Sequence, residues 1–292
     1  MNLEELGKAL KELSNDKTPG TDGFTTNFYK FFWPDIKYLL YDTFCYSFEM
    51  GLLSCNQRRG LLNLIPKANK DLRFLKNWRP ISILNTDYKI LAKALASRLQ
   101  EVLPNLINKD QVGYIKGRNI GENIRMIDDI MKYTELKHLP GYIILIDFEK
   151  AFDSVSWEFL LNSLSSLNFG ENFIKWIKIM YKSIESCVTN NGYSSKYFQL
   201  SRGIRQGCPL SALLFILVAE IMAIKIRGQK DIKGIRCEKI EFKICQLADD
   251  STVFVRDLIT ICNVISILQK FELCSGIKIN IDKNLSDSSG YK

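Results

Sequence analysis

Three aspartates have the side-chain type and the placement to carry out metal-assisted chemistry. Asp147 follows four consecutive apolar residues, and Asp249 and Asp250 stand together between two apolar segments much later in the chain. A charge after an apolar run costs free energy unless it is paired or bound to a metal. Carboxylates can hold two divalent cations that activate an attacking hydroxyl and neutralise a leaving phosphate, and Mg²⁺ prefers such oxygen ligands. An Asp-Asp pair by itself is also typical of a turn, where Asp bonds the local backbone.

Other common catalytic groups are scarce in the sequence. His138 is the only histidine, and the eight cysteines form no C-x-x-C pair. A zinc knuckle or a Ser-His-Asp site is therefore not indicated. We expect the scattered cysteines to be small buried side chains, with no disulfide-linked partner.

The positive charge is concentrated in one segment. The stretch from Ser54 to Arg98 has ten basic and two acidic residues, so its charge of +8 equals that of the whole chain. With Phe74 and Trp78 interleaved, such a segment suits the phosphates of a nucleic acid or a nucleoside triphosphate. The alternative interpretation is a solvated, lysine-rich surface.

Helices and strands alternate irregularly in a chain of 292 residues that is 46% hydrophobic, a globular composition. We expect helices in residues 1–50 around a loop at 17–23. A short strand at 63–67 should be stopped by Pro66. A helix from Asp87 should bury Leu91, Leu95, Leu99 and Val102 and end at Pro104.

The second half predicts the elements that carry the aspartates. Residues 141–147 should form a buried strand, and 240–255 a hairpin with Ala248, Asp249 and Asp250 at its tip. Helices are expected at 157–167, at 173–184, after Pro209, and from about 260 to a glycine cap at Gly276. Ile277, Ile279 and Ile281 predict a half-buried strand. The class is mixed α/β (α+β).

No apolar stretch in the sequence is long and uncharged enough to predict a membrane-crossing helix. The apolar stretch from Ser211 is interrupted by Glu220, and the N-terminus lacks the apolar core of a signal peptide. We therefore expect an intracellular, soluble chain with no membrane partner.

Seven sequence blocks, in order, resemble the reverse transcriptase domain of non-LTR (LINE-type) retrotransposons. They begin with KTPGTDGF and LIPK…NWRPISILNTDYKILAKALASRL, followed by DQVGYIKGRNIGENI. ILIDFEKAFDSVSW resembles motif A, RGIRQGCPLSALLF motif B, QLADDS motif C, and SGIKINIDK the motif D region. Two positions depart from the family pattern, because Leu247 replaces an aromatic residue and Ala212 a proline. Neither change removes a carboxylate.

The resemblance implies a right-hand polymerase fold in which the palm is an antiparallel sheet backed by helices. It implies a helical extension at 1–60, fingers at 61–140, a palm at 141–286 and a polar tail at 287–292. Fingers and palm together form one reverse transcriptase domain at about 61–286. The thumb, the endonuclease and the zinc knuckle of full elements are not matched, which is expected for a fragment.

The implied activity is that of an RNA-directed DNA polymerase, a nucleotidyltransferase using two Mg²⁺ ions, with Mn²⁺ as a substitute. The implied partners are an RNA template, a DNA primer and deoxynucleoside triphosphates, in the nucleus or a cytoplasmic ribonucleoprotein. Asp147, Asp249 and Asp250 are the implied metal ligands. The implied nucleotide-binding residues are Lys67, Arg79, Phe152, Gln206 and Gly207. Arg58, Arg59, Lys93 and Arg118 are the candidate nucleic-acid contacts.

Two other functions and one other residue role stay open from the residues alone. The chain could be a catalytically inactive, nucleic-acid-binding remnant of the domain. A two-metal nuclease or phosphatase would share the aspartate chemistry, although it would leave the fingers motifs and Phe152 unexplained. Phe152 is expected to exclude a ribose 2′-hydroxyl, and its alternative role is core packing.

Overall fold

The computed structural model describes residues 1–15 and 17–280, which form two compact units. Of the described residues, unit 1 contains those within 1–99 and 164–211, and unit 2 contains 100–163 and 212–280. The chain passes between the units within α5 (Thr86–Leu106), within α8 (Trp157–Ser166) and at the start of α10 (Ser211–Gly228). The predicted boundaries of the helical extension, fingers and palm stay a prediction, and the predicted tail at 287–292 lies outside the described residues.

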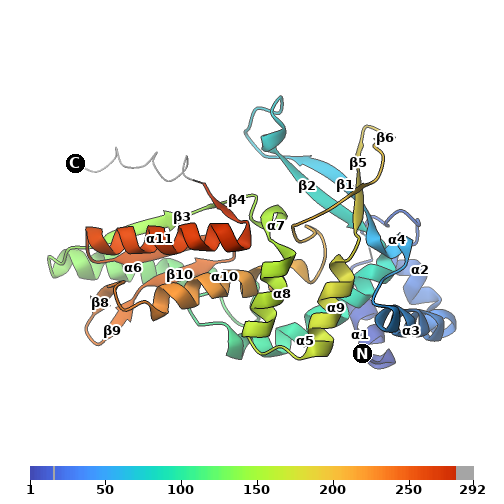
Figure 1. Cartoon of the computed structure of the whole chain (residues 1–292), viewed down its shortest axis with the longest axis horizontal. Helices are drawn as coiled ribbons and strands as arrows, with labels where there is room; N and C mark the ends of the chain where they lie inside the picture. Colours follow the sequence, from blue (N-terminus) through green and yellow to red (C-terminus); the bar gives the residue numbers. More distant parts are fainter. Residues whose placement is uncertain (16, 281–292) are drawn as a thin grey trace. The chain divides into compact units, whose positions relative to one another are not determined.

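Unit 1 begins with the helices that the sequence predicts for residues 1–50 (Figure 1). They are α1 (Leu3–Glu12), α2 (Thr26–Phe31) and α3 (Trp33–Met50), followed by the short α4 (Cys55–Arg58). Asn2 caps α1 in a capping box with Glu5, and Gly51 ends α3 in the left-handed conformation. Later in the chain, α9 (Glu171–Tyr181) contacts α3, where Phe48 and Trp176 have ring centroids 4.9 Å apart.

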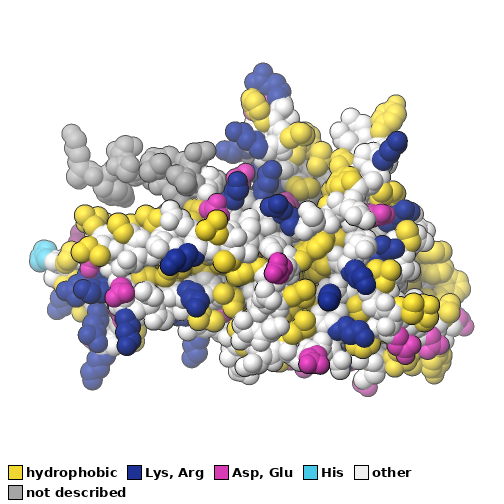
Figure 2. All heavy atoms as spheres, viewed as in Figure 1, with side chains coloured by type: hydrophobic (Ala, Val, Ile, Leu, Met, Phe, Trp, Pro, Cys, Tyr) yellow, Lys and Arg dark blue, Asp and Glu magenta, His cyan; other side chains and the backbone are white. Residues whose placement is uncertain are grey.

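The sheet of unit 1 joins segments that are far apart in sequence. β1 (Arg59–Pro66) pairs antiparallel with β2 (Trp78–Leu84) and parallel with β5 (Glu185–Asn190). β5 also pairs with β6 (Tyr193–Ser194) and β7 (Phe198–Gln199). A 3₁₀ turn, η1 (Leu75–Asn77), precedes β2. Figure 2 shows Lys and Arg side chains gathered at the end of the β1–β2 hairpin, where Lys70, Arg73 and Lys76 are exposed.

Unit 2 is built on an antiparallel three-stranded sheet in the order β10-β11-β3. The strands are β3 (Tyr142–Ile146), β10 (Ile244–Leu247) and β11 (Asp250–Val255). Two small ribbons join β4 (Phe148–Glu149) to β12 (Lys278–Ile279), and β8 (Ile235–Cys237) to β9 (Ile240–Phe242). The predicted hairpin is confirmed, since Leu247 pairs with Asp250 across it.

Helices cover this sheet (Figure 1). α6 (Ile120–Leu136) contacts β10 and β8, and its Ile130 lies in a buried cluster with Ile235, Cys245 and Phe254. α11 (Leu258–Ser275) contacts β11 and β12 and buries Val264, Leu268 and Phe271. Asp257 caps its start and Gly276, with φ of 76°, ends it as predicted. α7 (Ala151–Ser154) is a short turn after β4.

One prediction about an apolar segment is wrong. β3 is not a buried strand, because Tyr142 is 42% exposed and Leu145 is 60% exposed. The physical reason is its position at the end of the order β10-β11-β3, where it has a strand on one side only. The structure describes the predicted strand at 277–281 only as the two residues of β12, and Ile281 lies outside the described residues.

The helix after Asp87 also differs from the prediction. α5 continues past Pro104 to Leu106, and Val102 is 45% exposed whereas Leu103 is fully buried. Pro104 lies in the last turn, and the guanidinium of Arg118 donates to the carbonyls of Pro104 (3.0 Å) and Ile107 (2.8 Å). Side-chain donors can therefore satisfy the helix end despite the proline.

One described helix, α11, is long and apolar enough to cross a membrane by length and composition, with 28% of it buried. It contacts β11 and β12 and buries Leu268 and Phe271, whereas Ile259 and Leu273 are exposed. The expected absence of a membrane partner stays a prediction.

Candidate active site

Asp147 and Asp250 come from neighbouring antiparallel strands in unit 2. Ser251 pairs with Ile146 in the ladder of β11 and β3, so one further step of the same register places Asp250 opposite Asp147. Asp249 immediately precedes β11, on the turn between β10 and β11. The strand before Asp147 and the strand that begins at Asp250 are therefore neighbours in the sheet. Residues directly opposite each other in an antiparallel pair share a face of the sheet. The carboxylates of Asp147 and Asp250 therefore lie at one edge of the sheet.

The turn that carries Asp249 has an uncommon backbone. Leu247 and Asp250 pair across it, leaving Ala248 and Asp249 as its two central residues. Ala248 has φ of 56°, a conformation that glycine usually supplies at the first central position of such hairpins. Ala248 is 7% exposed and Asp249 is half-buried, whereas Asp250 is exposed.

Asn280 is a residue of this site that the sequence patterns did not single out. Its side-chain Nδ2 donates to the Asp147 Oδ2, and its backbone N–H donates to the Asp147 carbonyl, both at 2.9 Å. The pairing of β12 with β4 delivers Asn280 to this position, because Ile279 is paired with Phe148. Its amide side chain can orient the Asp147 carboxylate without adding charge.

The donor set fits divalent magnesium in its chemistry. In the described part of the chain, no three Asp, Glu, His or Cys side chains form a ready-made metal cluster. Mg²⁺ does not need one, since proteins commonly bind it through one or two carboxylates completed by water and substrate phosphates. Asp147 and Asp250 at one sheet edge, with Asp249 beside them, supply such oxygens.

Phe152 lies close to the aspartates in sequence and packs against a core helix. It belongs to α7, after Lys150, whose φ of 49° turns the chain out of β4. The Phe152 ring stacks on Phe215 of α10, with centroids 4.9 Å apart and planes 20° apart. Phe215 is fully buried, whereas Phe152 is half-buried. One side of the Phe152 ring is therefore used in packing, and its predicted contact with a nucleotide sugar stays a prediction.

Lys67 and Arg79 both lie on the β1–β2 hairpin of unit 1. Arg79 is exposed and is paired with Ile65 in the ladder. Lys67 follows the end of β1, its backbone N–H donates to Asn77 O (2.9 Å), and its Nζ donates to Lys76 O (2.9 Å). The hairpin thus places both cations near the same end of β2, as a shared phosphate site would require. Their predicted contact with a triphosphate stays a prediction.

Gln206 and Gly207 are fixed against β2 of the same unit. Ser82 N donates to Gln206 O at 2.7 Å. A Cβ on Gly207 would stand 2.6 Å from Ser82 O, and its φ of 101° is open to glycine alone without strain. Arg205, just before them, is 3% exposed, lies 5.2 Å from the Tyr88 ring and donates to Arg58 O. The glycine is required by the close backbone approach, and its nucleotide contact stays a prediction.

The four predicted nucleic-acid contacts all have partners within the chain. Arg58 donates to the Leu53 and Ser183 carbonyls, and Lys93 pairs with Glu12 at 2.9 Å. Arg59 pairs with Glu185 at 3.0 Å and lies 4.4 Å from the Tyr197 ring. The Glu185 carboxylate raises the pKa of Arg59.

Arg118 is the most heavily bonded of the four. Its guanidinium donates to the carbonyls of four residues, namely Asn108, Gln111, Pro104 and Ile107. Arg118 therefore fixes the loop after α5, and its predicted contact with nucleic acid stays a prediction.

An ion-pair network holds the segment between α5 and α6 in unit 2. Arg227 donates to Asp110 Oδ2 at 2.7 Å and also to Glu220 Oε1. Burial raises the pKa of Asp110, opposed by the Arg227 charge. Burial likewise raises the pKa of Glu220 to about 7. The sequence suggested no such network, because Asp110 is 117 residues from Arg227 in the chain.

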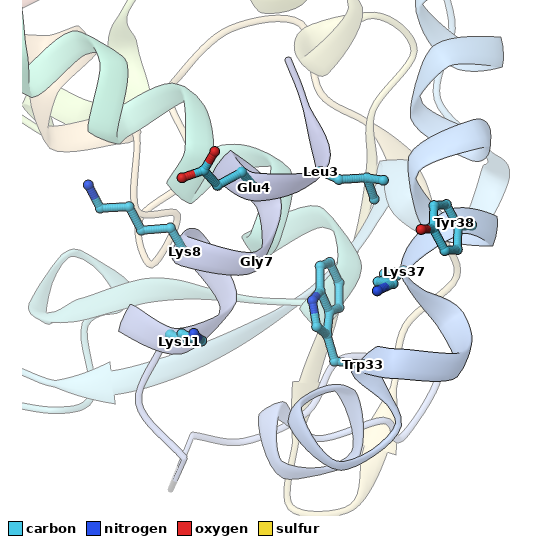
Figure 3. A pocket seen from close by; sticks show the side chains of 8 residues that line it. All are labelled: Leu3, Glu4, Gly7, Lys8, Lys11, Trp33, Lys37 and Tyr38. Carbon is cyan, nitrogen blue, oxygen red and sulfur yellow. The ribbon is translucent and has the colours of Figure 1, made fainter.

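An open groove lies between α1 and α3 in unit 1, and none of the predicted site residues lines it (Figure 3). The Trp33 side chain lies against α1, where a Cβ on Gly7 would be 3.3 Å from Trp33 Nε1. The other lining residues are Leu3, Glu4, Lys8, Lys11, Lys37 and Tyr38. None of the motifs described above falls in it.

The sequence and fold match a known family. The profile described as "Reverse transcriptase (RNA-dependent DNA polymerase)" matches residues 65–285, which include the hairpin Lys67 and all three aspartates. The chain belongs to this reverse transcriptase family.

Curated relatives narrow the class to mobile elements. The chain is 35% identical over 286 residues to the Xenopus laevis "Transposon TX1 uncharacterized 149 kDa protein", covering 97% of this chain and 22% of that protein. It is 25% identical over 291 residues to the Pol polyprotein of the type-2 retrotransposable element R2DM of Drosophila melanogaster, covering 97% and 26%. The chain thus corresponds to the reverse transcriptase domain of a non-LTR retrotransposon, and it spans about a quarter of the length of these relatives or less.

Solved structures support the polymerase fold. A telomerase from Candida tropicalis, in complex with a fragment of telomeric RNA, matches with a TM-score of 0.57 and 15% identity, over 89% of this chain and 44% of that chain. The apo telomerase of the same organism, truncated from its C-terminal domain, matches with a TM-score of 0.55 and 16% identity, over 80% and 50%. At these identities the likeness shows the fold alone. It agrees with the predicted right-hand polymerase fold.

Proposed function

We propose that this domain copies RNA into DNA, by adding deoxynucleotides to a DNA primer on an RNA template. The observation that carries the proposal is the register of β3 and β11, which aligns Asp147 with Asp250 and sets Asp249 beside them, inside the segment that matches the family. The family depends on divalent metal, and the proposed ions are two Mg²⁺, replaceable by Mn²⁺. We place the reaction inside the cell, in the nucleus or a cytoplasmic ribonucleoprotein.

The residues of the chain have separate roles in this proposal. Asp147, Asp249 and Asp250 hold the metal ions. Bound ions of this kind activate the primer hydroxyl and neutralise the charge that develops on the phosphates. Asn280 keeps the Asp147 carboxylate oriented through its 2.9 Å hydrogen bond. Lys67 and Arg79 contact the triphosphate as fixed positive charges, which stabilise negative charge without rearrangement during the reaction.

Phe152, Gln206 and Gly207 are each proposed to contact the incoming nucleotide. The exposed part of Phe152 would meet the sugar of the incoming nucleotide and exclude a 2′-hydroxyl by contact. Gln206 and Gly207 are supported by β2, which gives the backbone around them a fixed path. The exposed cations at the end of the β1–β2 hairpin supply long-range attraction for the template backbone.

A primer-extension assay tests the proposal. The full chain is incubated with an RNA template, an annealed DNA primer, the four deoxynucleoside triphosphates and Mg²⁺. Extension should occur with the wild type and fall by at least about 1,000-fold in Asp249→Ala, because the reaction depends on electrostatic stabilisation. The matched control is Asp231→Ala, an exposed aspartate of the same unit outside the site, which should extend normally.

The same assay separates the proposal from its alternatives. An inactive wild type that still binds RNA would identify the chain as a nucleic-acid-binding remnant. Primer extension by the Asp249→Ala variant at the wild-type rate would show that Asp249 is not a catalytic metal ligand.

A further inference from the structure

The amide side chain of Gln111 forms hydrogen bonds with both backbone groups of Ala248. Gln111 is 1% exposed, and its Oε1 accepts from Ala248 N at 2.9 Å while its Nε2 donates to Ala248 O at 3.3 Å. The same Oε1 accepts from Gly113 N at 2.8 Å. A buried amide with three partners is held in one orientation, because each lost bond would leave a polar group unsatisfied.

The partner of Gln111 has a backbone conformation that needs support from its surroundings. Ala248 precedes Asp249 and is held at φ of 56°, which costs free energy for a residue with a Cβ. Such a conformation persists only where the surroundings enforce it. The two hydrogen bonds from Gln111 meet the N–H and the C=O of this one residue, and so fix the orientation of the peptide groups on both sides of it.

The segment that carries Gln111 is itself anchored to β10. Gln246 N donates to Asp110 O at 2.8 Å, and Val112 N donates to Gln246 O at 3.0 Å. Arg227 holds the Asp110 carboxylate at 2.7 Å. Residues 110–113 therefore lie along the strand that leads into the turn and cannot slide relative to it without breaking several bonds.

Gly113 completes the contact by its lack of a side chain. A Cβ at this position would be 2.4 Å from Ala248 N and 3.0 Å from Ala248 Cα. Any other residue would push segment 110–113 away from the turn, because atoms at 2.4 Å overlap. The pair Gln111 and Gly113 is thus matched to Ala248 in both hydrogen bonding and shape.

We propose that Gln111 is a positioning residue for the aspartate turn: by binding both backbone groups of Ala248 it sets the direction in which Asp249 leaves the hairpin. The proposal rests on the proposed polymerase function, because the direction of Asp249 matters only if its carboxylate binds a catalytic metal. Segment 110–113 then belongs to the support of the active site and is not a surface for nucleic acid.

Two variants of the full chain test this role. Gln111→Met keeps the length of the side chain and loses all three hydrogen bonds. Gln111→Glu keeps the acceptor for both N–H groups and, as a carboxylate, lacks the donor to Ala248 O. The matched control is Gln57→Met in unit 1, because Gln57 is buried like Gln111 and also uses its amide in hydrogen bonds, to Asp87 (2.9 Å) and Ser54 (3.2 Å).

We expect the two methionine variants to have similar effects on stability and different effects on catalysis. Gln111→Met and Gln57→Met should lower the thermal midpoint by similar amounts. Only Gln111→Met should lower kcat for primer extension, by roughly 10- to 100-fold, with the KM for deoxynucleotides nearly unchanged, because a small misplacement of a catalytic group has effects of that size. Gln111→Glu should fall between the wild type and Gln111→Met.

Hydrogen exchange supplies a readout that does not need activity. The Ala248 amide should exchange at least about 10-fold faster in Gln111→Met than in the wild type, and should be unchanged in Gln57→Met, because only the first variant removes its acceptor. Peptides covering residues 244–252 report this by mass spectrometry.

The proposal is overturned if folded Gln111→Met or folded Gln111→Glu retains full kcat, or if the exchange of the Ala248 amide does not change. If Gln111→Met fails to fold, kcat and exchange in Gln111→Glu decide. A wild-type chain that shows no extension refutes the polymerase function and, with it, a catalytic role for Gln111. The exchange result then still shows whether the contact with Ala248 holds the turn.

Discussion

Asn280 is bonded to Asp147 twice, through its backbone N–H to the carbonyl and through its side-chain amide to Oδ2, each at 2.9 Å. The backbone bond extends the pairing of β12 with β4. This pairing fixes the position of Asn280 next to Asp147, so that its side chain can reach the carboxylate. Removal of the amide leaves the backbone bond intact. The effect of the side-chain hydrogen bond can therefore be separated from that of the backbone hydrogen bond by mutation.

Asn280→Ala should lower primer extension by roughly 10- to 100-fold and raise the Mg²⁺ concentration needed for half-maximal rate, as is usual for residues that orient a metal ligand. The measurement is extension rate as a function of Mg²⁺ concentration. Lys278→Ala, an exposed neighbour on β12, serves as the control and should leave the Mg²⁺ dependence unchanged. An unaltered Mg²⁺ dependence in Asn280→Ala would show that the hydrogen bond does not support metal binding.

Phe152→Val should raise the incorporation of ribonucleotides relative to deoxynucleotides by about 10-fold or more. The reason is that a smaller side chain leaves room for the 2′-hydroxyl. A steric contact worth a few kcal/mol changes the ratio of kcat/KM values by at least that factor. The measurement is kcat/KM for each nucleotide on the same template. Some loss of stability is expected as well, since the stacking on Phe215 is removed. Phe159→Leu, which disturbs a packed ring against Phe271, should lower stability without changing the ratio. Equal losses for both nucleotides in Phe152→Val would make Phe152 a packing residue only.

Arg79→Ala should raise the KM for deoxynucleotides about 10-fold and leave the salt dependence of RNA binding unchanged, because it removes a contact to the triphosphate and not to the template. Lys70→Ala, on the exposed loop between β1 and β2, should instead lower the salt slope by about one unit if that lysine neutralises a template phosphate. RNA binding measured at several salt concentrations distinguishes the two. A lowered slope with unchanged nucleotide KM in Arg79→Ala would assign Arg79 to the template.

The stability of the domain should depend on pH through Glu220. Burial raises the pKa of Glu220 to about 7 from its ordinary value of 4.5, so at intermediate pH the folded chain holds a proton that the unfolded chain has lost. The stabilisation is complete below pH 4.5 and is lost as the pH rises to about 7, an effect of about 1–3 kcal/mol. Denaturant unfolding at several pH values measures it.

Glu220→Gln provides the comparison for this prediction, because glutamine resembles the protonated acid and does not titrate. The difference in unfolding free energy between Glu220→Gln and the wild type should widen from pH 4.5 to 7.5 in favour of Gln. A difference that does not vary with pH would mean that Arg227 keeps Glu220 ionised in the folded chain.

The elements that carry the aspartates were predictable because their signals are local. The position of Asp249 and Asp250 between two apolar segments predicted the hairpin, and the structure confirms it. The end of the last helix followed from Gly276, which can take the left-handed cap. The wrong prediction that β3 is a buried strand has a physical reason as well. An apolar run is compatible with a central or an edge strand, and only the order of the sheet distinguishes them.

The supporting residues could not be found from the sequence, because their partners are remote. Gln111 and Ala248 are separated by 137 residues, and Asn280 and Asp147 by 133. A buried glutamine or asparagine has no periodic pattern of its own, and its burial follows from tertiary contacts. Segment 110–113 was assigned to the fingers by resemblance, and its bonds to Ala248 emerged only from the structure.

The parallel pairing of β1 with β5 has a consequence during synthesis of the chain. Arg59 of β1 is matched with Glu185 of β5, 126 residues later. At ordinary translation rates that stretch takes about 6–25 s to make, during which β1 has an open edge able to bind other extended segments. The sheet of unit 1 can therefore close only after β5 has been made, and a premature stop codon between β1 and β5 would yield a product in which this edge of β1 lacks its partner.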